Sequence, residues 1–133
     1  MGKYGDAALI AVRMLQAGTS LSPADAWDAA ITEMFPDTSS SKKMGCPRGT
    51  FLGLCGKGLI RGISPNGHTR PEKNMSYGIR AVEFLRKDPS LASDKRLLWN
   101  KVIGDEPKAQ NHQMDVVISL WENDLFTNQR VLL

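Results

Sequence analysis

The sequence has no apolar run approaching the roughly 18 residues that a membrane-spanning helix requires. It also shows no signal peptide, because the first residues, Met-Gly-Lys-Tyr-Gly-Asp, begin a helical pattern without an apolar segment before it. Both absences argue against a membrane or secreted protein. We therefore expect a soluble, cytoplasmic protein that has no membrane partner.

Cysteine and histidine are scarce, with two residues of each kind in the chain. Reduced thiols are more common than a disulfide when a cytoplasmic protein has two cysteines, although the sequence leaves both states open. The four residues are Cys46, Cys55, His68 and His112. Their spacings of eight, twelve and forty-three intervening residues match no usual zinc pattern. We predict no metal site and no cofactor.

Low-complexity tracts and extremes of composition are also missing. Apolar residues make up 41% and charged residues 23% of the chain, which are ordinary values for a globular protein. A chain of 133 residues is the usual size of one domain and can bury a core without disulfide or metal support. We predict a single domain over residues 1–133.

Apolar residues recur at helical spacing in six segments, which predicts an all-α, six-helix fold. The clearest start is at Ser22 and Pro23, a capping residue followed by a proline suited to the first turn. The helices are expected at about residues 3–17, 22–35, 47–55, 73–87, 93–103 and 111–123. A turn at residues 64–67 leaves a small β-hairpin near residues 59–70 as an open alternative to a plain loop.

Large aromatic and acidic residues fit the same helical pattern. Trp27, Trp99 and Trp121 occupy core-type positions, so we interpret them as packing residues and not as platforms for stacked bases. The carboxylates on or beside the last helix and in the loop before it are interpreted as ordinary surface charges: Asp105, Glu106, Asp115, Glu122 and Asp124.

The two halves of the sequence resemble each other at shifts of 66 to 72 residues. The shifts place Leu15 on Leu85, Trp27 on Trp99, and Leu59-Ile60 on Leu125-Phe126. We predict two tandem three-helix pseudo-repeats, at about residues 4–63 and 74–126. The alternative is that amphipathic helices resemble one another by chance.

Each predicted repeat ends with an apolar pair that follows a short break after the last helix. This ending resembles the close of the third helix in a winged helix-turn-helix domain. In the first repeat, Arg61, the turn at residues 65–67, His68 and Arg70 would form the wing. The second repeat departs from the pattern because it has no basic wing.

The net charge is only +3, but residues 37–73 contain seven bases and two acids. If a helix begins at Pro47, the free amides of Arg48, Gly49 and Thr50 would point towards a bound anion. A glycine-rich helix start that permits close packing is the alternative. The candidate anion-binding residues are Lys42, Lys43, Arg48, Gly49, Lys57, Arg61 and Arg70.

These features favour a non-enzymatic protein that binds nucleic acid or another polyanion. A protein-interaction or self-associating module is the alternative, since the basic segment could also meet acidic side chains. A third hypothesis is a small enzyme that uses Cys46, which lies near a predicted helix start and beside lysines. No base is placed beside Cys46 by the sequence, so we predict no catalytic residue.

Three segments also resemble a family of small uncharacterised bacterial proteins. They are residues 3–8, residues 43–55 with the Gly-Cys-Pro-Arg-Gly motif, and residues 111–117. The resemblance spans most of the chain and implies no activity.

Overall fold

The computed structural model describes residues 2–19, 21–36, 44–65, 73–127 and 129. These residues form six α-helices and one short 3-10 helix, and they contain no β-strand. The α-helices are α1 (Gly2–Gln16), α2 (Pro23–Met34), α4 (Gly45–Gly56), α5 (Lys73–Lys87), α6 (Lys95–Ile103) and α7 (Gln113–Glu122). The predicted all-α class is confirmed. None of the described helices combines the length and apolar character needed to cross a membrane.

Local capping sets where two of the helices begin. The hydroxyl oxygen of Ser22 accepts the amide of Asp25 at 3.1 Å, so α2 starts at the predicted place. The carboxylate of Asp94 accepts the amide of Leu97 at 3.1 Å, and α6 therefore starts two residues after the predicted position. The 3-10 helix Pro89–Ser93 precedes it.

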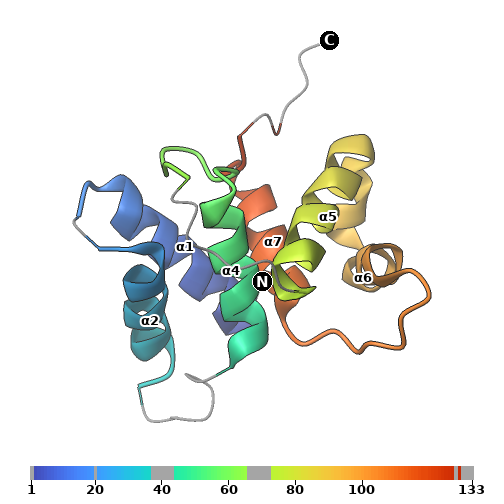
Figure 1. Ribbon diagram of the computed structural model, residues 1–133, viewed down its shortest axis with the longest axis horizontal. Helices are drawn as coiled ribbons and strands as arrows, with labels where there is room; N and C mark the ends of the chain where they lie inside the picture. The colour runs from blue at the N-terminus through green and yellow to red at the C-terminus, as the bar shows by residue number, and fades with distance from the viewer. Residues whose placement is uncertain (1, 20, 37–43, 66–72, 128, 130–133) are drawn as a thin grey trace.

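The helices form two lateral pairs around a central pair (Figure 1). α1 and α2 lie on one side, α5 and α6 lie on the other, and α4 and α7 lie between them. α1 also packs on α7, and α5 also packs on α4. Every residue of α7 from Gln113 to Trp121 is buried, so this helix is the centre of the fold.

The tryptophans belong to the core, as their spacing predicts. Trp27 is fully buried and its ring lies 5.1 Å from that of Phe51. Trp99, on the other side of the molecule, meets the ring of Tyr77 edge-on at 5.1 Å. Trp121 is also buried. Aromatic pairs therefore stabilise both halves of the fold.

α4 and α7 end in the same hydrogen-bonded turn. The backbone amide-to-carbonyl bonds that close these turns run from Leu59 to Leu54 and from Leu125 to Leu120, each 3.1 Å. The residue in the turn has a positive φ in both, 72° at Gly58 and 58° at Asp124. Such left-handed residues commonly end helices, and glycine adopts the conformation without strain.

The segments after these turns pair with each other across the molecule. Ile60 forms an isolated antiparallel bridge with Phe126. The flanking amide-to-carbonyl bonds run from Arg61 to Leu125 and from Thr127 to Leu59, each 2.8 Å. The hairpin alternative is not seen in the described residues, because Ile60 pairs with the other half of the chain. Residues 66–70 of that expected hairpin lie outside the described residues.

Candidate anion-binding site

The start of α4 differs from the prediction. The helix begins at Gly45, two residues before Pro47, because the first-turn amides need no helical partner and proline is tolerated there. The amides of Gly49 and Thr50 therefore lie within the helical hydrogen-bonding pattern. The amides of Gly45 and Cys46 begin the helix instead, so the predicted set of free amides was wrong.

The two described arginines of the predicted site bind within the chain. Nε of Arg48 lies 3.1 Å from Oδ1 of Asp28, which joins α4 to α2. Nε of Arg61 donates to the backbone carbonyl of Asp124 at 2.8 Å, and its Nη2 lies 3.5 Å from Oδ1 of the same residue. Both guanidinium groups therefore have structural partners.

The described members of the predicted site do not converge. Lys57 is exposed at the opposite end of α4, about 13 Å along the helix axis from Arg48. Gly49 is half-buried beside Arg48. Lys42, Lys43 and Arg70 lie outside the described residues.

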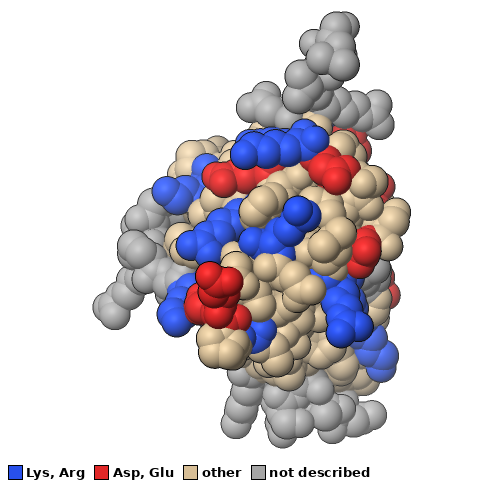
Figure 2. All heavy atoms as spheres, turned by 90° about the vertical axis from the view of Figure 1, so that its right-hand side faces the viewer, with Lys and Arg blue, Asp and Glu red and all other residues tan. Residues whose placement is uncertain are grey.

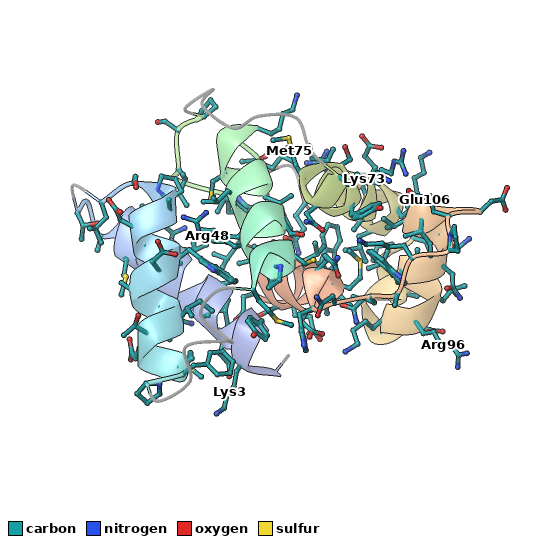
Figure 3. All side chains as sticks on the ribbon, turned by 60° about the horizontal axis from the view of Figure 1, so that its bottom comes forward. Lys3, Arg48, Lys73, Met75, Arg96 and Glu106 are labelled. Atoms are coloured by element: carbon teal, nitrogen blue, oxygen red, sulfur yellow. The ribbon has the colours of Figure 1, made fainter. Side chains whose placement is uncertain are left out.

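Three basic residues instead line one pocket beside α6. The pocket has a volume of about 470 Å³, within the range typical of ligand sites. Its lining contains three cationic residues and no acidic one: Lys95, Arg96, Trp99, Asn100, Lys108, Ala109 and Gln110. Arg96 projects outward from α6 on the side of the molecule opposite Arg48 (Figure 3). We name this feature the α6 pocket.

Hydrogen bonds hold the walls of the α6 pocket in place. Nε1 of the Trp99 indole donates to the carbonyl of Lys108 at 2.9 Å, which ties the segment after α6 to that helix. The side-chain oxygen of Gln110 accepts the amide of Met114 at 3.1 Å, which caps α7. A ligand would therefore meet a largely preformed cavity.

The three cations of the α6 pocket differ in whether they form ion pairs within the protein. Among the described residues, the side chains of Arg96 and Lys108 make no ion pair. Nζ of Lys95 lies 2.8 Å from Oδ1 of Asp115. Figure 2 shows that basic and acidic side chains alternate over the face of α5 and α6. The lining of the α6 pocket, by contrast, has no acidic residue.

Asp115 is buried, and its interpretation as a surface charge was wrong. It is only 5% exposed, and its second oxygen, Oδ2, lies 2.8 Å from Nδ1 of His112. The missed signal is the consecutive run from Val116 to Ile118, which places apolar residues on several faces of the helix. Such a helix is central, and its polar residues must find partners inside the protein.

A further polar cluster joins α5 to the segment after α6. The Tyr77 hydroxyl donates to the Glu106 carboxylate at 3.0 Å, and Nζ of Lys73 lies 3.4 Å from it. Burial raises the pKa of Tyr77, and this hydrogen bond is the second largest cause of the increase. The same bond lowers the pKa of Glu106. Lys73 and Glu106 lie close together in Figure 3, and we assign the cluster a structural role.

The two cysteines lie in different surroundings on α4. Cys55 is fully buried, and burial raises the pKa of its thiol to about 12. Cys46 is partly exposed, and its thiol has no hydrogen-bond partner among the described residues. In that part of the chain, no three His, Cys, Asp or Glu side chains form a group that could hold a metal ion.

We expect the two thiols to react at very different rates. At pH 8, iodoacetamide should modify Cys46 first and Cys55 far more slowly, because Cys55 is buried and the raised pKa of its thiol leaves little of the reactive thiolate. Mass spectrometry of peptides from the folded protein measures both rates. The variant Cys46→Ser should retain only the slow thiol, and unfolding in denaturant should equalise the rates. Fast modification of Cys55 in the native protein would contradict this assignment.

The fold and the α6 pocket define a small helical protein with a candidate anion-binding site. Residues 1–127 match a family of unknown function, DUF6979, and the chain belongs to that family. This match confirms the resemblance to an uncharacterised family. No curated protein and no solved structure matches the chain significantly. Because membership carries no activity, the function is argued from the residues of the site.

Proposed function

We propose that this protein binds a polyanion, with nucleic acid as the first candidate, through the cations of the α6 pocket. The observation that supports this proposal is that Lys95, Arg96 and Lys108 surround one cavity that has no acidic lining residue. Lysine and arginine contacts to phosphates supply most of the affinity in such complexes.

The pocket chemistry favours backbone phosphates over base edges. Arg96 can form two parallel hydrogen bonds with one phosphate, and Lys108 acts as a point charge. Trp99 is only 5% exposed, so it is a wall of the pocket and leaves little ring surface for stacking. We therefore expect binding with little sequence preference.

The proposal moves the main site away from the start of α4. Arg48 and Arg61 have acidic partners within the chain, which reduces the charge available to a ligand. Lys57 is exposed, and Lys42, Lys43 and Arg70 remain predicted contacts. They would extend the contact surface, and the α6 pocket would carry the main contacts.

Reversing the charges of Arg96 and Lys108, which form no ion pair with any described residue, should weaken binding. We expect Arg96→Glu/Lys108→Glu to reduce the affinity for labelled RNA and DNA at least about tenfold at about 50 mM salt. The slope of log affinity against log salt should fall by about two, one for each lost phosphate contact. Fluorescence anisotropy at several salt concentrations measures both quantities.

A matched control separates the pocket from net charge. Lys3→Glu/Arg13→Glu changes the charge equally at two exposed positions of α1, which lies on the other side of the molecule from α6 (Figure 1). It should leave affinity within about threefold of the wild type, because screening weakens charges more than a Debye length away. The proposal fails if the wild-type protein binds neither nucleic acid at about 50 mM salt.

A protein-interaction or self-associating module is the alternative proposal. Among the described residues, the exposed large hydrophobic side chains are Leu21 and Leu97, one before α2 and the other on α6. Scattered apolar residues are normal on the surface of a monomer and do not mark an interface.

We also propose that the chain contains the predicted duplication. Two features support it. The turns that close α4 and α7 contain equivalent hydrogen bonds, whose residues differ in number by 66. Corresponding helices of the two halves also pack on corresponding partners. α1 packs on α2 and α7, as α5 packs on α6 and α4. Superposition of the two halves in an experimental structure tests this, and different helix crossings would contradict it. The winged helix-turn-helix likeness remains a prediction.

A further inference from the structure

A histidine and a buried carboxylate form a pair at the start of α7. Nδ1 of His112 lies 2.8 Å from Oδ2 of Asp115, and Oδ1 of the same carboxylate binds Nζ of Lys95 at 2.8 Å. Asp115 is 5% exposed, whereas the side chain of His112 is 42% exposed. The carboxylate is thus held inside the protein while the imidazole reaches the surface.

This geometry determines what each ring nitrogen can do. With the Nδ1 proton donated to Asp115, Nε2 of the neutral ring carries the lone pair. Among the described residues, Nε2 has no hydrogen-bond partner. A buried carboxylate behind an imidazole holds the ring in one tautomer and stabilises the imidazolium that forms when Nε2 takes a proton.

The backbone and the neighbouring ring also fix the position of His112. Its φ is +69°, a left-handed conformation that is uncommon for residues other than glycine. The imidazole packs on the ring of Tyr4, with 4.6 Å between the centroids. Non-glycine residues in this conformation cluster at functional sites.

Capping by the His112 side chain does not account for the pair. His112 is the N-cap residue of α7, but its side chain makes no capping hydrogen bond. Gln110 instead accepts the amide of Met114 in the first turn. A polar side chain at this position usually caps the helix, and here Gln110 makes that capping hydrogen bond in place of His112.

We infer that His112 and Asp115 form a proton-transfer site for the hydrolysis of an ester that carries an anionic group. Lys95 links this pair to the α6 pocket, since it binds Asp115 and also lines the pocket. His112 would be the catalytic residue and Asp115 the positioning residue. The preference for an anionic substrate rests on the proposed function, whereas the proton transfer does not.

The reaction can be written completely. Nε2 of His112 takes a proton from water as the water oxygen bonds to the carbonyl carbon of the ester. The bond from that carbon to the leaving oxygen then breaks, which releases the alkoxide or phenolate and the carboxylic acid. His112 returns its proton to the leaving group or to solvent, so the imidazole is regenerated. No oxidant, reductant or metal ion takes part.

Two chromogenic esters test the inference: neutral p-nitrophenyl acetate and anionic mono-p-nitrophenyl succinate. We expect His112→Gln to lower the protein-dependent release of nitrophenolate at least about tenfold for both esters. His68→Gln, which changes the other histidine of the chain, should leave both rates unchanged. Asp115→Asn should lower kcat with little change in KM, provided that circular dichroism shows a folded protein.

The outcomes separate the site from the proposed function. Equal rates for His112→Gln and the wild type would overturn the proton-transfer site, whether or not nucleic acid binds. Loss of hydrolysis in His112→Gln without nucleic-acid binding would support the site and count against polyanion binding. If Asp115→Asn is unfolded, Lys95→Met provides a second test. It removes the other partner of the carboxylate and should raise KM for the succinate ester more than for the acetate.

Discussion

Replacement of Gly53 with alanine is expected to destabilise the protein by about 2 kcal/mol or more. Gly53 lies on α4 where Met75 of α5 packs against it (Figure 3). A methyl group added at Gly53 would lie 2.4 Å from Cγ, 2.6 Å from Cβ and 2.8 Å from Cα of Met75. The last contact involves the backbone, so rotation of the Met75 side chain cannot relieve it.

The sign of this prediction depends on two opposing effects. Alanine in place of glycine favours a helix interior by about 1 kcal/mol. Overpacking of a core typically costs about 1–3 kcal/mol, and more when two backbones must separate. Because the contacts with Met75 include the α5 backbone, we expect overpacking to exceed the helix preference.

Gly45 provides the matched control in the same helix. A methyl group there meets no atom within 4 Å, and the φ of Gly45 is not positive. Gly45→Ala should therefore be neutral, or stabilise the protein by up to about 1 kcal/mol. Urea denaturation followed by circular dichroism measures both variants. Equal free energies of unfolding for the two would contradict the packing of α4 against α5.

Removal of the Trp27 side chain should have the largest effect on stability, a loss of about 3–5 kcal/mol for Trp27→Ala. The ring is fully buried between α2 and α4, against Phe51, so the substitution leaves a cavity and removes a large apolar contact. Leu97→Ala, at a side chain that is 43% exposed, should change stability by less than about 0.5 kcal/mol.

Phenylalanine variants of Trp27 and Trp99 allow a sharper comparison. Nε1 of Trp27 is buried without a hydrogen-bond partner among the described residues, whereas Nε1 of Trp99 donates to Lys108. Trp27→Phe removes an unpaired polar group, and Trp99→Phe breaks a hydrogen bond. Trp27→Phe should therefore cost less. The same denaturation measurement tests this, and a larger loss for Trp27→Phe would mean that its indole N–H has a partner in solution.

The starts of the helices show how far local sequence information extends. Ser22 and Pro23 specify the beginning of α2, because the cap bonds to an amide three residues away. The beginning of α4 was predicted less well, since its N-cap residue, Met44, makes no side-chain capping bond. A proline within the first turn can occupy more than one position there.

The candidate site depended more on tertiary contacts. Arg48 and Asp28 are far apart in the sequence, and so are Lys95 and Asp115. No local sequence pattern predicts that Arg48 forms an ion pair whereas Arg96 forms none among the described residues. A count of charges along the chain indicates a basic segment, but it does not show that Arg48 and Arg61 have partners within the protein.

The sequence by itself determined the all-α class, the approximate limits of the helices and the buried tryptophans, because helical periodicity and capping act over a few residues. Only the tertiary structure decided that α7 is central, that Asp115 is buried beside His112 and that three cations surround the α6 pocket. The physical reason is that burial and charge pairing depend on which helices pack together. Such packing is set by the sum of many weak contacts between residues distant in the sequence.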